Sequence, residues 1–174
     1  MTVNAFNDMA SETALPNAQY RRFESFREYE ALFDTLIPRT QSVIRVFDRA
    51  LATAWNTQIR TAQLRHFLRQ SPANRLLVIL HETHAIESHM PRVAALNRDF
   101  GHAFKIRQTP RMAHHLYDPF VVFDASHYLH RFHHAHMRAA IGTDEVDGAQ
   151  QLIDRHLELW EVSLPISFGR PSGL

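Results

Sequence analysis

The stretch RLLVILHE, residues 75–82, carries the strongest fold signal in the chain. Its centre, 76–80, is continuously apolar, and an apolar run without polar alternation is typical of a strand that is covered on both faces. Such strands belong to sheets that carry helices on both sides. The stretch therefore predicts the central strand of an α/β sheet.

Strands and helices are predicted to alternate on either side of this strand. SVIRVFD (42–48) and AFKIRQT (103–109) are strand-like. Helices are predicted over 57–70 and 91–101. In the second of these, Pro91 suits the first helical turn and Gly101 suits the C-terminal cap. A further helix precedes them, with Ser25 and Glu28 forming a capping box. Because strands that alternate with helices run parallel, we expect a largely parallel sheet.

The last third of the chain has a different pattern. Two strand-like runs, 118–124 and 128–134, are separated by a short turn, which predicts a hairpin. A helix with one apolar stripe is predicted over 144–163. The expected fold is α/β, with a mixed, mostly parallel sheet, helices on both faces, and a C-terminal β-hairpin plus helix. The expected organisation is a flexible N-terminal arm (1–22), a single domain (23–163) and a C-terminal tail (164–174).

The composition limits the possible functions. The 174 residues include 19 basic and 18 acidic side chains, so we expect no nucleic-acid partner. There is no cysteine, and no apolar run approaches the roughly 18 residues of a membrane span. The N-terminus lacks the features of a secretory signal, so we expect a cytoplasmic protein that does not bind membranes. Lys105 is the only lysine.

Histidines are concentrated in SHYLHRFHHAH, residues 126–136. On a strand, His130, His134 and His136 would point to one side, and imidazoles arranged in this way can hold zinc. Tyr128 and Phe132 share that side, which favours an ordinary solvent-facing strand instead. We therefore expect no cofactor and keep zinc as an alternative, with further ligands from His114, His115 or Asp124.

A second group of candidates lies where predicted strands end. His81, Glu82 and His84 follow the carboxyl end of the central strand, which is where open α/β sheets place their ligands. The histidine spacing does not fit the helical motif of zinc proteases. Asp48 and Asp124 also end strands, and such carboxylates serve either in catalysis or as caps of turns.

The hairpin DPFVVFDASHYLHRF and the helical HLELWEVS resemble one half of the phospholipase D-like fold over roughly residues 23–163. They resemble more closely an uncharacterised proteobacterial domain family that is a degenerate relative of that fold. The phospholipase D signature is H-x-K-x-x-x-x-D. In the best register Tyr117 takes the histidine position, Pro119 takes the lysine position, and only Asp124 matches. The Gly-Ser that follows in the active family falls on Arg131 and Phe132.

These departures decide the expected function. The phospholipase D reaction needs an imidazole nucleophile and a lysine charge, and no H-x-K occurs in the chain. The resemblance therefore implies a non-catalytic binding or regulatory domain. A single half implies a homodimer, with the hairpin and the last helix as contacts. A metal-dependent or histidine-based hydrolase that uses the 114–136 histidines is the alternative. A small anion is the expected ligand, and the candidate residues are Asp48, His81, Glu82, His84, Arg111, His115, Tyr117, Asp124 and Arg131.

Overall fold

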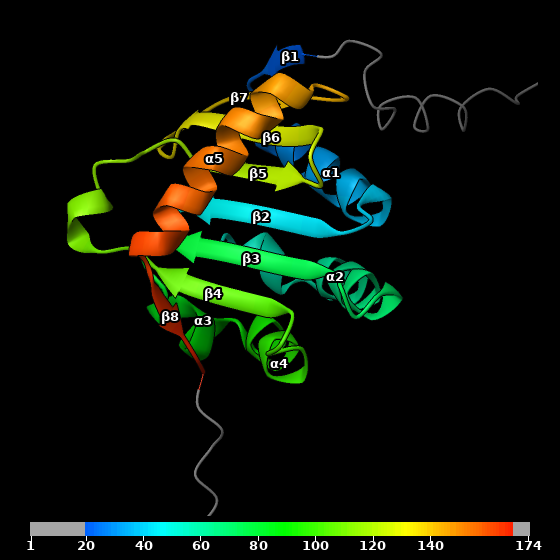
Figure 1. The fold of residues 1–174 in the computed structure, drawn as a ribbon, viewed down its shortest axis with the longest axis vertical. Helices are drawn as coiled ribbons and strands as arrows, with labels where there is room; N and C mark the ends of the chain where they lie inside the picture. The colour runs from blue at the N-terminus through cyan, green and yellow to red at the C-terminus, as the bar shows by residue number, and fades with distance from the viewer. Residues whose placement is uncertain (1–19, 169–174) are drawn as a thin grey trace, which may run out of the picture.

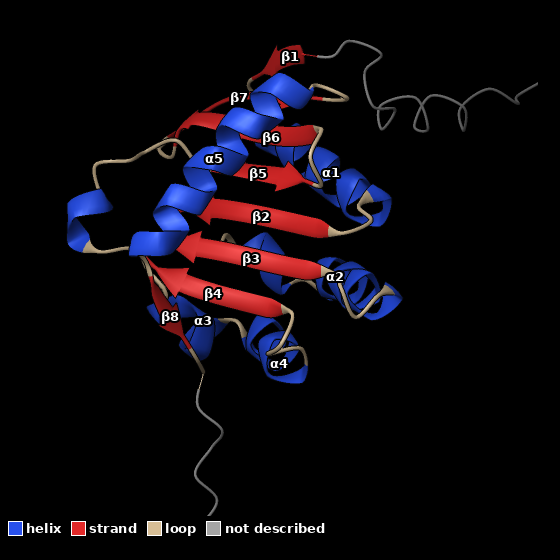
Figure 2. Cartoon of the chain, in the orientation of Figure 1, coloured by secondary structure: helices blue, strands red, loops and turns tan. Residues whose placement is uncertain are grey.

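The computed structural model describes residues 20–168, which form one open sheet of eight strands with helices on both faces (Figure 1, Figure 2). The strand order is β1-β7-β6-β5-β2-β3-β4-β8. The strands are β1 (Tyr20–Phe23), β2 (Val43–Asp48), β3 (Arg75–Leu80), β4 (Phe104–Gln108), β5 (Phe120–Phe123), β6 (His127–His133), β7 (His136–Gly142) and β8 (Leu164–Ile166). The helices are α1 (Phe26–Leu36), α2 (Gln58–Gln70), α3 (His84–His89), α4 (Pro91–Asp99) and α5 (Val146–Val162), with short 3-10 turns η1 (Ile37–Arg39), η2 (Thr53–Asn56) and η3 (Arg111–Ala113).

The central strand predicted from 75–82 is confirmed as β3. It lies between β2 and β4 and pairs with both in parallel. Leu76, Val78 and Leu80 pack against one helical layer, and Ile79 packs against the other. The continuous apolar run is therefore explained by burial on both faces.

The expectation of a mostly parallel sheet is wrong, although the mixed α/β class is confirmed. Only the β2–β3 and β3–β4 pairs are parallel, and the other five pairs of neighbouring strands are antiparallel. The strands β5, β6 and β7 follow one another through short turns, and turns of this length join only antiparallel neighbours. The short strands β1 and β8 add one antiparallel pair at each edge.

The predicted hairpin is present as β5 and β6, but it lies inside the sheet. Phe120 pairs with His130 across the hairpin, and β6 pairs on its other side with β7, a strand that the sequence pattern did not predict. The predicted final helix is α5. Because β5 also pairs with β2, neither hairpin strand offers a free edge to a second chain.

Two boundaries of the predicted domain differ from the structure. Residues 20–22, expected in the arm, belong to β1, and residues 164–166, expected in the tail, form β8. The remainder of the predicted arm, 1–19, and the end of the tail, 169–174, lie outside the described residues. None of the helices in the described part of the chain has the length and apolar character needed to cross a bilayer.

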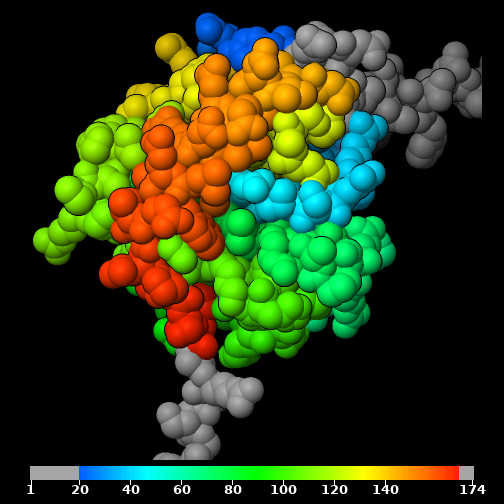
Figure 3. Space-filling model, viewed as in Figure 1, coloured from blue at the N-terminus to red at the C-terminus, as the bar shows by residue number. Residues whose placement is uncertain are grey.

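The helices divide into two layers, as predicted. Side chains of α1, α2, α3 and α4 pack on one face of the sheet. α5 crosses the other face (Figure 1, Figure 3). His156 of α5 is 1% exposed and its Nε2 lies 3.2 Å from the Leu77 carbonyl oxygen. Its ring stacks on Trp160. Burial lowers the pKa of His156 to about 4, so this imidazole is part of the core in its neutral form.

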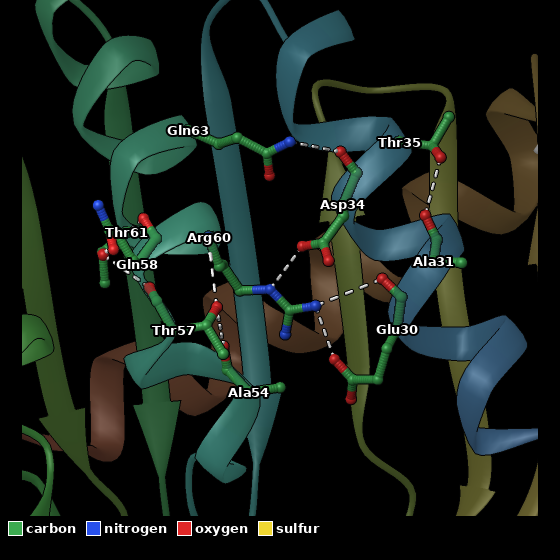
Figure 4. Close-up of polar contacts among 10 residues, drawn as sticks. All are labelled: Glu30, Ala31, Asp34, Thr35, Ala54, Thr57, Gln58, Arg60, Thr61 and Gln63. Atoms are coloured by element: carbon green, nitrogen blue, oxygen red, sulfur yellow. Dashed lines mark hydrogen bonds and ion pairs between the residues drawn. The ribbon is translucent and has the colours of Figure 1, made fainter.

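A buried arginine joins α1 to α2 (Figure 4). Arg60 of α2 is 2% exposed, and its guanidinium lies 2.7 Å from the Asp34 carboxylate and 2.6 Å from that of Glu30. It also lies over the Phe33 ring at 4.4 Å. The two helices therefore pack through a neutralised charge as well as through apolar contacts.

Candidate functional site

The parallel strands end at the same edge of the sheet, here named the carboxyl edge. Asp48, Leu80 and Gln108 are the last residues of β2, β3 and β4. The antiparallel pairing of β5 with β2 brings Pro119 and Phe120 to this edge as well. The loop that leads from β4 to β5, and the turn from β6 to β7, complete it. Four separate chain segments therefore converge where α/β folds hold ligands.

A cavity of about 210 Å³ opens at this edge. Its size suits a small ligand rather than a bulky one. It contains three imidazoles, one guanidinium and one carboxylate, set against apolar and aromatic walls. The lining residues are Phe47, Arg49, His81, Glu82, His114, Leu116, Tyr117, Pro119 and His134.

His81 forms a fixed wall of the cavity. It is 4% exposed, and its Nε2 donates to the Leu116 carbonyl oxygen at 2.9 Å. Its Nδ1 lies 2.6 Å from the Thr109 hydroxyl and must accept that proton, because Nε2 carries the ring hydrogen. Burial lowers the pKa of His81. This imidazole is therefore neutral and has no free nitrogen for a ligand.

The second imidazole, His114, is not held in this way. The centroid of its ring lies 4.6 Å from that of the His81 ring. No residue in the described part of the chain hydrogen-bonds to the two ring nitrogens of His114. It is partly exposed and lines the cavity. His114 can consequently donate a hydrogen bond to a ligand, whereas His81 only packs against the His114 ring.

Arg49 links the two sides of the cavity. Its Nε donates to the Glu82 carboxylate at 3.0 Å, and its Nη1 lies 3.3 Å from Nε2 of His134. The Tyr117 ring, at the rim, lies 5.4 Å from the His134 ring. Arg49 thus keeps donor hydrogens that the single pairing with Glu82 does not use.

Several predicted ligand residues do not reach the cavity lining. Asp48 lies at the carboxyl edge, where it accepts the Arg49 backbone N–H at 2.7 Å, and burial raises its pKa to about 6. Arg131 donates to the His134 carbonyl oxygen at 2.5 Å and lies over the Phe26 ring. The other three are exposed and do not line the cavity: His84, Arg111 and His115.

Asp124 lies at the opposite edge of the sheet. Its backbone φ is 54°, in the left-handed region that aspartate tolerates better than most residues. Its carboxylate accepts hydrogen bonds from the backbone N–H groups of residues 41–43 and from the Ser42 hydroxyl. These bonds lower the pKa of Asp124 despite its partial burial. The one residue that matches the phospholipase D signature therefore caps the start of β2.

The three histidines proposed as metal ligands have different partners. His130 lies 3.0 Å from Asp118, which is paired in turn with Arg155 of α5. Although burial opposes the shift, hydrogen bonds from His130 and Arg155 lower the pKa of Asp118 to about 2. His134 lines the cavity and His136 lies at the start of β7. Within residues 20–168, no three His, Asp or Glu side chains are arranged to hold a metal ion.

Of the candidate ligand residues, His81, Glu82 and Tyr117 line the cavity; Arg49 also lines it and was not a candidate, and His114 was considered only as a metal ligand or as part of the hydrolase alternative. Arg49 directly follows β2, so the rule that marked His81 at the end of β3 would also have marked Arg49. The Leu116 carbonyl and the Thr109 hydroxyl have no sequence signal of their own, because the loop between β4 and β5 positions them.

The comparisons agree with this architecture. A family model described as Domain of unknown function (DUF7931) matches residues 25–170. The comparison with curated proteins gives no match. Nuc from Salmonella typhimurium, a phospholipase D family member, is similar in structure, with a TM-score of 0.61 and 11% identity over 86% of this chain and 98% of Nuc.

Two further solved structures are similar. NucT from Helicobacter pylori has a TM-score of 0.51 and 8% identity over 84% of this chain and 98% of NucT. The archaeal chromatin protein TrmBL2, described as showing a novel mode of DNA binding, has a TM-score of 0.64 and 9% identity over 91% of this chain and 58% of TrmBL2. At these identities the likeness concerns the fold alone, which is phospholipase D-like.

Proposed function

The chain belongs to the family described as Domain of unknown function (DUF7931) and has a phospholipase D-like fold, and from this premise we propose that it is a non-catalytic domain that binds a small anion. The ligand class is phosphate or a phosphate monoester. The proposed site is the cavity at the carboxyl edge.

One observation carries the proposal. Tyr117 and Pro119, which take the histidine and lysine positions of the signature, both line the cavity. The positions from which a nucleophile and a lysine charge would act therefore hold a phenol and a ring without an N–H. Lys105, the only lysine, borders a separate cavity beside β4 and β8.

The donors in the cavity support an anionic ligand. The Arg49 guanidinium is always charged and presents a fork of N–H groups, which suits phosphate and carboxylate oxygens. His114 and His134 line the same cavity. His114 adds a further donor, and His134 adds one when its ring is protonated. Glu82 neutralises part of this charge through its pairing with Arg49. The combination favours an ion of low charge over a polyanion.

A calorimetric titration of the untagged chain with inorganic phosphate tests the proposal. We expect saturable binding, and we expect Arg49→Ala to weaken it about tenfold or more, since a hydrogen bond to a charged group contributes about 1.5–3 kcal/mol. Arg69→Ala is the matched control, because Arg69 is exposed on α2 and does not line the cavity. Unchanged binding in Arg49→Ala would exclude the proposed cavity.

A histidine-based hydrolase is the second candidate, and the free imidazole of His114 favours it. Incubation with bis(p-nitrophenyl) phosphate separates the two functions. The binding domain should release no nitrophenolate above the background of a His114→Asn variant. Turnover that His114→Asn abolishes would replace the binding proposal with the hydrolase.

A further inference from the structure

His134 makes an unusual contact with the charged Arg49. The 3.3 Å separation between Nη1 of Arg49 and Nε2 of His134 joins a group that can only donate to a ring nitrogen. The contact is favourable only when Nε2 is a lone-pair acceptor. The single ring hydrogen of His134 must then be on Nδ1, which is buried and has no hydrogen-bond partner within the described residues.

The surroundings of His134 are strongly basic. His133 stacks on it with ring centroids 4.7 Å apart, and the ring of His136 lies 5.4 Å from that of His133. Arg131 of β6 donates to the backbone oxygen of His134, and Arg49 approaches from the end of β2. Glu82, beyond Arg49, supplies the compensating negative charge. Tyr117 of the loop between β4 and β5 covers the ring from the rim.

This environment disfavours a positive charge on the His134 ring. Burial and the charges of His133, Arg49, Arg131 and His136 lower the pKa of His134. A second hydrogen, on Nε2, would also point at the guanidinium of Arg49. His134 is therefore neutral around pH 7 when no ligand is present.

An anion between the two side chains would reverse this preference. One oxygen atom could accept from Arg49 while another accepts from a protonated Nε2 of His134, so that both donors are satisfied and the repulsion is screened. From the contact between Arg49 and His134, and on the basis of the proposed function, we propose that the cavity binds its anion together with one proton, which His134 takes up. The site is then a proton-coupled anion receptor whose affinity rises as the pH falls.

Sulfate is the appropriate probe, because its charge stays constant near neutral pH whereas that of phosphate changes. Calorimetric titrations at fixed pH, in two buffers of different ionisation enthalpy, count the protons taken up on binding. We expect an uptake that approaches one proton per sulfate. By linkage, the dissociation constant should then increase about tenfold per pH unit between about pH 7 and about pH 8.

His134→Gln is the test variant, since glutamine can accept from Arg49 but cannot take up a proton. It should bind sulfate with little proton uptake and a flat pH dependence. His102→Gln is the matched control, because His102 is exposed and distant from the cavity lining. The imidazole resonances of the wild-type protein give a measurement that needs no variant. Sulfate should raise the pKa of His134 and leave the positions of the His102 resonances unchanged.

The outcomes separate this inference from the proposed function. Sulfate binding without proton uptake would overturn proton coupling and leave the anion site intact. Equal proton uptake by wild type and His134→Gln would overturn the assignment to His134. A protein that binds neither sulfate nor phosphate at any pH would overturn the proposed function itself.

Discussion

At the scale of single residues, the carboxyl edge contains a half-buried acid without a cationic partner among the described residues. Asp48 forms no ion pair with any residue in the range 20–168, and its carboxylate accepts only the adjacent backbone N–H. Burial raises its pKa from 3.8 to about 6, although the charge of Arg131 opposes the change. The folded protein therefore binds a proton at Asp48 more tightly than the unfolded chain does.

Asp48→Asn should stabilise the protein at neutral and alkaline pH. Because the folded-state pKa is raised, wild type loses stability as the pH rises from about 4 to about 6, and asparagine avoids this loss. We expect the free energy of unfolding of the variant at pH 8 to exceed that of wild type by about 2–3 kcal/mol. The difference should shrink towards pH 4. Urea unfolding at several pH values provides the measurement, and a constant difference would contradict the assignment.

His156 titrates with the opposite sign. Its folded-state pKa of about 4 lies below the ordinary value of 6.5. The contribution of neutral His156 to the free energy of unfolding is therefore fully present above about pH 6.5, and it is lost as the pH falls towards 4. His156→Gln should remove a loss of about 3 kcal/mol across this range. Since Asp48 acts oppositely between about pH 4 and about pH 6, the unfolding curves are best compared in the Asp48→Asn background. An unchanged slope in His156→Gln would mean that the pKa of His156 does not differ between the folded and the unfolded state.

The residues at the site differ in how far the sequence reveals them. His81, Glu82 and Tyr117 were predictable, since each lies at or near the end of a strand or in the signature register. Whether an imidazole is blocked or free was not predictable. His81 and His114 have the same side chain, and the loop between β4 and β5 decides that one is fixed by two hydrogen bonds.

At the scale of secondary-structure elements, apolar patterning identified the strands that are buried on both faces. β3 follows directly from its continuous apolar residues, whereas β2 and β4 were predicted as strand-like runs although they contain Arg45, Lys105 and Arg107. β7 was missed because its first half is exposed and polar, and because alanines account for two of its buried residues. β1 and β8 have four and three residues, and they exist because a neighbouring strand pairs with them.

The contact between α1 and α2 around Arg60 provides a test at this scale. The guanidinium of Arg60 is buried, whereas the side chains of Glu30 and Asp34 are 31% and 37% exposed. Removing the carboxylates leaves an uncompensated buried charge, but removing the arginine leaves carboxylates that water can reach. We expect the Glu30→Gln/Asp34→Asn double variant to lose about 3 kcal/mol or more. Arg60→Met should lose less, because it retains the packing on Phe33.

Urea unfolding of both variants at pH 7 ranks them. The Arg69→Met variant on the exposed face of α2 is the control for the loss of an arginine. Greater destabilisation by Arg60→Met than by the double variant would show that packing, rather than charge compensation, makes the larger contribution of this contact to the free energy of unfolding.

At the scale of the whole molecule, the proposed homodimer keeps only one of the two contacts first expected. The β5–β6 hairpin has strands on both sides, so α5 is the element of the original proposal that offers an exposed surface. Leu157 and Val162 of α5 are 48% and 56% exposed. An apolar contact through these side chains would bury surface that otherwise faces water.

Sedimentation velocity of the untagged chain tests the dimer. We expect a dimer for wild type and a monomer for Leu157→Glu/Val162→Glu. Ile59→Glu is the matched control, since Ile59 is 69% exposed on α2, in the opposite helical layer. A dimer that survives the double substitution would place the contact elsewhere, for example at the edge strand β1. A wild-type monomer at all concentrations would refute the homodimer.

The cap formed by Asp124 has a consequence for how such chains are recognised. Its carboxylate joins the end of β5 to residues 41–43 at the start of β2, more than 80 positions earlier in the chain. Because the turn depends on this carboxylate, the fold alone constrains the residue at this position, whether or not the protein catalyses a reaction. A match to the signature at this one position therefore carries no information about catalysis.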